Sequence, residues 1–496
     1  MSKKPNIVLI VLDTTRATNL SCYGYSKQTS PNLDKISEEG VLFTNAISNS
    51  SWTLPAHASL FTGTFPSVHS VNEWTDRLPD HLVTMAQFFS NQDYQTVAIN
   101  NNSWINEQFG LDRGFKVVKK IWLLLQTSND LNVTSRSIKN VNLFKKICKV
   151  SKNVFRGNLL LNLVNGVYGQ FLHNRHDLGG KRILKAFEKW FHTERNTEKP
   201  FFLFMNLLEP HLPYTPPRQC LSRFFDGKFS DKQIEGLNQD PFPYVVGIEK
   251  KSALDLEILT ALYDAEINYL DSLIASIYNI LYQTNHLDNT ILIIVGDHGE
   301  NLGEHGLMSH FFCLYDTLIH IPLIIRFPSA FSKASKNENI VQLSDLFPSL
   351  AALAGLENHL PHEQIEGRNI FASDLNDRIA VSELLGTNPP LEVIAKKTGI
   401  PEVNLARLNK KIVAFRNKKY KFIEDSLGNE EFYNIVEDPR ELNNLIDKNP
   451  KTLAQFKRFK EYWGSRKVVG EKSRQANESS KLEKETFKRL KALGYL

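Results

Sequence analysis

The chain has 496 residues, of which 42% are hydrophobic and 23% are charged, and its formal net charge at pH 7 is +5. The length suggests more than one folded unit, and the composition is that of a globular protein. Because the charge is small for this length, the composition gives no support for nucleic-acid binding, and we expect no nucleic-acid partner.

The N-terminal segment "MSKKPNIVLIVLD" places an apolar run between two lysines and Asp13. The run is about seven residues long, which is too short to span a membrane and weak as the core of a signal peptide. No other stretch approaches the roughly 18 unbroken apolar residues that a spanning helix needs. We therefore expect a cytoplasmic protein.

Continuous apolar runs recur along the chain, as expected for strands buried on both faces of a parallel sheet. They lie at residues 6–13, 96–100, 200–209, 290–300 and 322–328. Amphipathic helical patterns lie between them, for example at residues 30–40 and 254–281. This alternation predicts an α/β fold with a mostly parallel central sheet flanked by helices.

A basic stretch interrupts the pattern, since Asp130 is the only acidic residue between Lys116 and Arg156. We expect a helical insertion over about residues 116–180. It is either a solvated surface or a surface for an anionic substrate or lipid headgroups, through which the protein could contact a membrane peripherally.

The character of the chain changes after about residue 370. Short hairpin-like segments, "RIAVSEL" and "KIVAFRNKKYKFIED", precede a charged helical tail. We therefore predict a catalytic α/β domain over residues 1–370 and a smaller C-terminal α+β subdomain with a helical tail over residues 371–496.

The cysteines lie far apart without a CxxC pair, which argues against a disulfide framework or a zinc knuckle and favours buried free thiols. They are Cys22, Cys148, Cys220 and Cys313.

Three of the predicted strands end in polar residues that could share a metal ion. These endings are Asp13-Thr14, Glu209-Pro210-His211 and Asp297-His298-Gly299-Glu300. Functional groups gather at the carboxyl edge of such sheets, so we expect these side chains to lie close together. Two carboxylates and an imidazole suit a divalent ion such as Ca²⁺, Mg²⁺, Mn²⁺ or Zn²⁺.

Thr53 opens the segment "TLPAHASLFTG", in which Pro55 suits the first turn of a helix. A threonine in this place is usually a helix cap, and its position alone favours that interpretation. The same place also offers free backbone N–H groups to an oxyanion. A hydroxyl held there beside a divalent cation could attack phosphorus or sulfur, so the residues alone leave both roles open.

These segments, with others in the same order, make the chain resemble the sulfatase family of the alkaline phosphatase superfamily. The matching motifs are "NIVLIVLDTTRATNLSCYGY", "SPNLDKISEEGVLFTNA", "WTLPAHASLFTGTFPSVHS", "LEPHLPY", "YDAEINYLD", "IVGDHGENLGEHG", "LYDTLIHIPLIIRFP", "QLSDLFPSLAALAG", "EEFYNIVEDPRELNNL" and "KRLKALGYL". The resemblance spans the chain except the basic insertion. It implies an alkaline-phosphatase-like fold and a hydrolase of ester bonds that uses a divalent metal ion.

The resemblance also assigns roles to residues. Asp13, Asp297 and His298 match metal ligands, and Thr53 stands at the position of the nucleophile, which also contacts the metal. His211 matches a histidine that contacts the ester group.

His310 falls roughly where the family usually has a substrate-binding lysine; a purely structural histidine is the alternative. Together with His211, and with Glu304 or His305, it could hold a second metal ion. Otherwise His211 and His310 would only donate hydrogen bonds to the bound anion.

Three positions depart from the family pattern. Thr53 replaces the Cys or Ser that sulfatases oxidise to formylglycine, and a secondary alcohol would give a ketone instead of an aldehyde. His57, which we keep as a candidate catalytic residue, replaces an arginine and so removes a permanent bidentate donor. Thr14 replaces the second aspartate after the first strand, which leaves the metal site less negative.

These departures favour phosphate or phosphonate esters, with a metal-activated Thr53 forming a covalent intermediate, as in phosphatase and phosphodiesterase members of the superfamily. One alternative is a phosphoethanolamine- or glycerophosphate-transferase-like enzyme acting on a lipid or glycan, with the basic insertion as its acceptor surface. Another is a sulfuric ester hydrolase proper. The surviving ligand set disfavours a non-catalytic binding protein. We expect a small-molecule, lipid or glycan ester as substrate, and the oligomeric state stays open.

Overall fold

The computed structural model describes residues 4–72, 76–121, 177–225, 227–331, 333–372, 378–387 and 389–465. Within these residues, a nine-stranded central sheet has the strand order β11-β2-β10-β6-β1-β5-β3-β4, with β9 paired to β2. Its strands are β1 (Asn6–Leu12), β2 (Val41–Ile47), β3 (Gln95–Asn100), β4 (Val117–Lys120), β5 (Phe201–Leu207), β6 (Thr290–Gly296), β9 (His320–Ile321), β10 (Leu323–Arg326) and β11 (Ser335–Gln342).

All five apolar runs that predicted strands form strands of this sheet, namely β1, β3, β5, β6 and β10. The neighbours β6, β1, β5, β3 and β4 are parallel. Strand β10 runs antiparallel to both β6 and β2, so the sheet is mostly parallel. Every residue of β1, β5 and β6 is buried, which explains why their sequences are continuously apolar.

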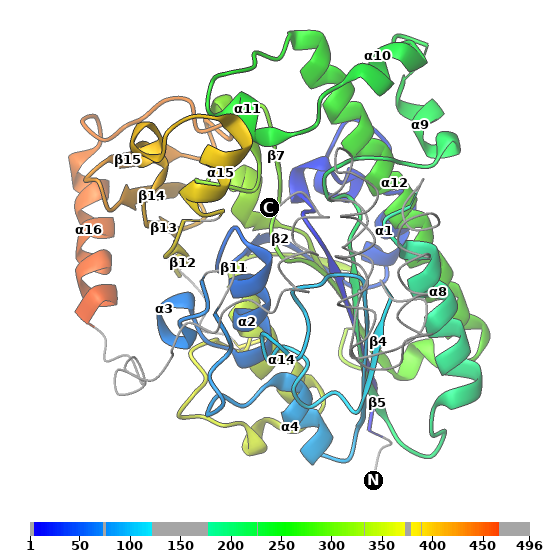
Figure 1. The fold of residues 1–496 in the computed structure, drawn as a ribbon. Coiled ribbons are helices and arrows are strands. Elements are labelled where there is room, and N and C mark those ends of the chain that lie inside the picture. Colours follow the sequence, from blue (N-terminus) through cyan, green and yellow to red (C-terminus); the bar gives the residue numbers. More distant parts are fainter. Residues whose placement is uncertain are drawn as a thin grey trace, which may run out of the picture.

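Helices cover both faces of the sheet. Figure 1 shows α2 (Thr53–Thr62), α4 (Met85–Asn91) and α14 (Leu346–Leu353) on one side, and α1 (Pro31–Ser37), α8 (Gly180–Lys189) and α12 (Ala253–Gln283) on the other. The predicted helix at 254–281 is α12, which begins after a capping box in which Ser252 Oγ accepts from the backbone N–H of Asp255. The shorter helices are α3 (Pro66–His69), α9 (Arg218–Phe225), α10 (Asp231–Gly236), α11 (Pro241–Val245) and α13 (Asp316–Ile319).

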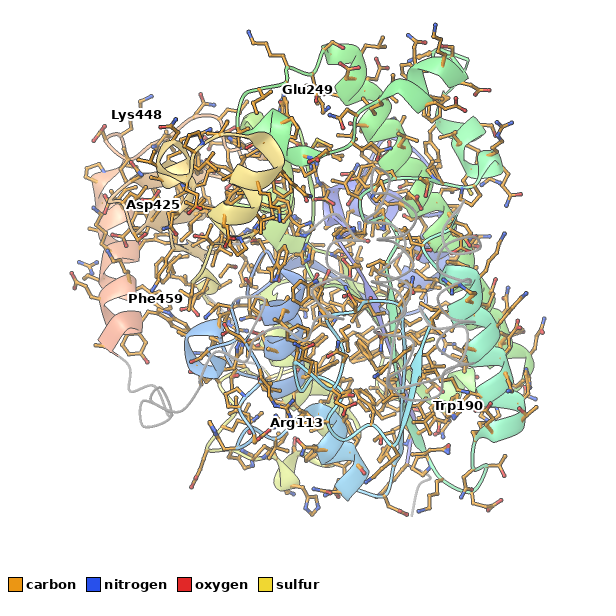
Figure 2. The ribbon with its side chains drawn as sticks, in the orientation of Figure 1. Arg113, Trp190, Glu249, Asp425, Lys448 and Phe459 are labelled. Carbon is orange, nitrogen blue, oxygen red and sulfur yellow. The ribbon has the colours of Figure 1, made fainter. Side chains whose placement is uncertain are left out.

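A second, antiparallel sheet follows near the C-terminus, in the order β12 (Ala380–Leu384), β13 (Ile412–Arg416), β14 (Tyr420–Asp425) and β15 (Glu430–Asn434). Helix α16 (Pro450–Ser465) lies along its outer side (Figure 1) and carries Phe459 (Figure 2), whose ring centroid is 5.9 Å from that of Phe415 in β13. Helix α15 (Leu391–Thr398) instead places Ile394 in the main hydrophobic core. The predicted C-terminal α+β subdomain is confirmed, and its exact boundary stays a prediction.

The predicted basic insertion lies largely outside the described residues, as does Cys148. Its first residues are described and differ from the prediction, because Val117–Lys120 form the edge strand β4 instead of a helix. This strand was not predicted because it is short and its two lysines made it look like part of the basic stretch. In the part of the chain that the structure describes, no helix combines the length and the apolar character needed to cross a membrane.

Candidate active site

The site lies at the carboxyl edge of the four neighbouring parallel strands β6, β1, β5 and β3. In register, Leu12 of β1 is the partner of both Gly296 in β6 and Leu207 in β5. The chains therefore leave the sheet side by side, and Asp13 and Asp297 emerge as neighbours.

Asp13, Asp297 and His298 form the candidate metal centre. All three are buried, and one ligand atom of each lies within 4.8 Å of the others. Asp13 Oδ2 accepts a hydrogen bond from Asn102 Nδ2 (2.6 Å), and Asp297 Oδ1 accepts from the backbone N–H of Thr14 (3.2 Å) and of His298 (2.8 Å). Asp13 Oδ1 and Asp297 Oδ2 have no hydrogen-bond partner. Each carboxylate thus keeps one buried oxygen for a cation, so the residues fit a divalent ion.

Burial raises the pKa of both Asp13 and Asp297, and the charge of Asp13 raises that of Asp297 further. Two adjacent carboxylates in a buried site disfavour each other's ionised form. A divalent cation between them would reverse this effect, because it supplies the missing opposite charge.

Thr14 holds an unusual backbone conformation beside this centre. Its φ is 50°, in the left-handed region that a β-branched residue rarely adopts. This conformation lets the Thr14 backbone N–H reach Asp297 Oδ1. Strain of this kind persists where the surrounding structure enforces it, as it often does at functional sites.

Thr53 is the first residue of α2 and does not cap it. The N-cap residue is Trp52, and no side chain caps the helix. Instead, the Thr53 hydroxyl lies 3.1 Å from His298 Nε2. His298 Nδ1 donates to the carbonyl of Gly299 (2.9 Å), so Nε2 is the nitrogen that accepts from Thr53. The Thr53 side chain is therefore directed at the candidate metal centre.

His57, one helical turn further on, supports the backbone of Thr53. Its Nδ1 donates to the carbonyl of Thr53 (2.9 Å) and lies 3.7 Å from Asp297 Oδ2. Burial lowers the pKa of His57 to about 4, so the ring is neutral at neutral pH. Unlike the arginine of the family pattern, it brings no permanent charge to the site.

His211 and His310 complete the group of predicted site residues. The ring centroid of His310 lies 4.6 Å from that of His298 and 5.3 Å from that of His211. His211 Nδ1 donates to the carbonyl of Leu212 (2.6 Å). Burial lowers the pKa of His211 to about 4 and that of His310 to about 3. The structure thus brings to one place the residues Asp13, Thr53, His57, His211, Asp297, His298 and His310.

The structure does not support a second metal ion held with Glu304 or His305. Both carboxylate oxygens of Glu304 accept from the guanidinium of Arg16, at 2.8 and 2.9 Å, and His305 stacks on Tyr315 with ring centroids 3.8 Å apart. Among the described residues, the group of Asp13, Asp297 and His298 is the only one in which three potential ligands come this close.

The sequence analysis missed two residues of this site, Asn102 and Trp52, and one contact, that of Glu300 with His310. Asn102 bonds Asp13, Glu300 Oε1 accepts from His310 Nδ1 (3.2 Å), and the ring centroid of Trp52 lies 5.2 Å from that of His310. Asn102 could have been found, since it follows the end of β3 at the same edge of the sheet. Glu300 stood in a recognised strand ending, but no pattern linked it to His310.

A family model described as Sulfatase matches residues 5–356 of the chain. An arylsulfatase of Clostridium perfringens is 26% identical over 469 residues, which cover 90% of this chain and 90% of that protein. An N-acetylglucosamine-6-O-sulfatase of Bacteroides thetaiotaomicron is 25% identical over 481 residues, which cover 90% of this chain and 83% of that protein.

Among solved structures, a phosphonate monoester hydrolase of Agrobacterium radiobacter superposes with a TM-score of 0.66 at 17% identity. The match covers 93% of this chain and 95% of that one. At this identity the likeness concerns the fold, and it confirms the predicted alkaline-phosphatase-like α/β architecture.

Proposed function

The chain belongs to the sulfatase family and is an ester hydrolase, and on that basis we propose that Thr53 is its nucleophile. We further propose that phosphate or phosphonate esters are preferred over sulfate esters. The observation that carries the proposal is the 3.1 Å contact between Thr53 Oγ1 and His298 Nε2, which directs the hydroxyl to the Asp13–Asp297–His298 centre.

A divalent ion held by Asp13, Asp297 and His298 would supply positive charge to the ester and favour the ionised form of the attacking hydroxyl. The protein contributes the placement of Thr53 at the start of α2, where no side chain caps the helix and the helix N-terminus suits a tetrahedral anion. His57 steadies the Thr53 backbone, and in this proposal His211 and His310 would contact the ester. Since all these side chains are buried, the site excludes bulk water and strengthens these polar contacts.

The preference for phosphorus esters follows from the alcohol itself. Threonine carries a secondary hydroxyl, which cannot become the aldehyde of formylglycine, but it can form and release a phosphoryl ester.

A sulfuric ester hydrolase is the second candidate, because the relatives found by sequence carry sulfatase names. The glycan sulfatase among them makes a glycan ester a reasonable substrate for either chemistry. The transferase alternative depended on the basic insertion, which lies mainly outside the described residues.

An assay with an aryl sulfate, a phosphate monoester, a phosphodiester and a phosphonate ester, each with added Mn²⁺, Zn²⁺, Mg²⁺ or Ca²⁺, tests both proposals. We expect turnover of phosphorus esters, a fall in kcat of at least about 10³-fold in Thr53→Ala, and partial activity in Thr53→Ser. Intact-mass measurement after acid quenching should detect the covalent intermediate. Full activity of Thr53→Ala would exclude this nucleophile, and turnover of the sulfate ester alone would refute the preference for phosphorus.

A further inference from the structure

We propose that Glu300 is a positioning residue for His310. Its carboxylate binds Nδ1 of the imidazole, so that Nε2 is the nitrogen presented to the substrate ester. The inference deepens the proposed function and rests on it, because it assumes that the ester binds beside Thr53.

The contact between Glu300 and His310 is buried. His310 Nδ1 donates to Glu300 Oε1 at 3.2 Å, and the two side chains are fully buried. The hydroxyl of Ser309 lies at a similar distance, 3.3 Å, from the same nitrogen. Of these two neighbours Glu300 Oε1 is the closer, and a carboxylate oxygen is an acceptor, whereas the Ser309 hydroxyl can either donate or accept.

The backbone of Glu300 is fixed independently of His310. Its carbonyl accepts from Arg16 Nε, and its N–H donates to the carbonyl of Thr317 (3.1 Å). The preceding Gly299 makes this approach possible, because a Cβ there would lie 2.1 Å from the Thr317 carbonyl oxygen. The Glu300 carboxylate is therefore attached to a fixed turn of the backbone, and it can hold the His310 ring in one orientation.

The imidazole lies among the neighbours of the proposed nucleophile. Its ring centroid is 4.6 Å from that of His298, which bonds Thr53, and 5.2 Å from that of Trp52, which precedes Thr53 in the chain. These rings confine the plane of His310. These ring contacts do not determine which of the two nitrogens of His310 carries the proton. A hydrogen bond from Nδ1 does, because it fixes the proton on that nitrogen and leaves Nε2 unprotonated.

The replacement of lysine by histidine explains why such a partner is needed. A lysine ammonium can present any of three donors to an anion, whereas an imidazole meets the substrate through one nitrogen and needs the correct orientation and tautomer. In metal sites, carboxylate partners fix the orientation and the tautomer of the histidines that bind the metal. Glu300 and His310 together would thus form the unit that replaces a single lysine.

A double-mutant cycle tests the pairing. Glu300→Ala and His310→Gln, alone and combined, are assayed for kcat and KM with the best substrate of the panel, with bound metal quantified in each variant. We expect Glu300→Ala to lower kcat by about 10- to 100-fold, the range known for partners of ligating histidines, with metal content unchanged. The double variant should lose no more than His310→Gln alone. Glu300→Gln, which keeps an acceptor oxygen, should recover part of the loss.

Two matched controls separate positioning from a general structural role. Glu304→Gln changes a carboxylate of the same loop that bonds Arg16, and its effect should add to that of His310→Gln. Ser309→Ala removes the other neighbour of Nδ1 and should have a smaller effect than Glu300→Ala. In parallel, ¹H–¹⁵N spectra of the histidine rings should show a protonated Nδ1 of His310 in the wild type and a change in Glu300→Ala.

Additive losses in Glu300→Ala and His310→Gln would overturn the inference, as would unaltered histidine spectra in Glu300→Ala. Failure of the proposed function would look different, because Thr53→Ala would then keep its activity whatever the outcome of this cycle.

Discussion

Two largely buried polar regions each include residues of the segment 297–319, and they differ in how their charged groups are paired. One is the active site. The other, which we call the anchor cluster, consists of Asp316, Arg416, Lys421 and Glu441. In the anchor cluster Lys421 Nζ lies 2.9 Å from Asp316 Oδ1 and 2.7 Å from Glu441 Oε1, and Arg416 Nε lies 3.0 Å from Asp316 Oδ2. The active site instead leaves Asp13 Oδ1 and Asp297 Oδ2 without a hydrogen-bond partner.

The pKa values of the carboxyl groups differ between the two regions as a result of this difference in pairing. Burial alone would raise the pKa of Asp316, but the charges of Arg416 and Lys421 outweigh it and lower this pKa. Burial raises the pKa of Asp297, and it raises that of Glu300 to about 8. Glu441, which shares Lys421 with Asp316, has a pKa raised by burial, so the contrast is sharpest between Asp316 and Asp297. A carboxyl pKa is therefore lowered where cations pair with the group, as at Asp316, and raised where burial acts without such a partner, as at Asp297. The second pattern is the one that is common at functional sites.

The largest expected effect is at the active site, where one substitution should remove metal binding and activity without lowering stability. Asp297→Asn should abolish tight metal binding and activity, because the centre loses a charged ligand. The metal-free variant should nevertheless melt at or above the temperature of metal-free wild type, since the repulsion from Asp13 disappears. Metal quantification and calorimetry in chelator check both parts. Unchanged metal content would show that Asp297 is not a ligand.

The reverse result is expected in the anchor cluster. Lys421→Met should lower the free energy of unfolding by about 3–5 kcal/mol, the usual cost of removing one partner from a buried ion pair. Its kcat at a permissive temperature should stay close to that of wild type. Lys457→Met is the matched control, because Lys457 also pairs with a glutamate but its side chain is 42% exposed, and it should cost less than about 1 kcal/mol. Equal losses of unfolding free energy in Lys421→Met and Lys457→Met, measured in urea, would show that the anchor cluster is no more important for stability than a surface ion pair.

The sequence predicted what depends on local pattern. The continuous apolar runs identified β1, β5 and β6, and the polar residues after them located Asp13, Asp297 and His298 at one edge of the sheet. The assignment of Thr53 needed the family resemblance, since its position alone indicated a helix cap.

Contacts between distant segments were not predictable in this way. Asn102 and Asp13 are 89 residues apart, and Arg16 and Glu304 are 288 residues apart. No periodicity or spacing links such residues, which is why Glu304 was expected at a second metal and is found in an ion pair. Strand β2 was also missed, because Thr44 and Asn45 interrupt its apolar residues.

A smaller effect is expected when a residue that hydrogen-bonds a proposed metal ligand is changed, and it tests whether such a residue contributes to metal affinity. Asn102 donates to Asp13 Oδ2, and its own carbonyl oxygen accepts from the backbone N–H of Trp104 (3.0 Å), which fixes the amide in this direction. Asn102→Ala should weaken metal binding about 10- to 100-fold, as measured by competition with a chelating indicator. Asn106→Ala, on the same loop but bonded only to its neighbours, should bind metal as wild type does. Identical affinities in the two variants would show that Asn102 does not orient Asp13.

The smallest effect concerns pH and a paired carboxylate next to the site. Burial would raise the pKa of Glu304, but the charge and hydrogen bonds of Arg16 lower it to about 2, below its ordinary value of 4.5. A depressed pKa in the folded state stabilises the protein fully above about 4.5, and this contribution is lost as the pH falls from there to about 2. Because Glu304 is partly exposed, we expect about 1–2 kcal/mol, measured as the difference in urea unfolding between wild type and Glu304→Gln in chelator. The difference should shrink steadily below pH 4.5. A difference that grew on acidification would mean that Glu304, like Asp297, is held without an effective partner, and the contrast between the two kinds of buried carboxylate would fail at this position.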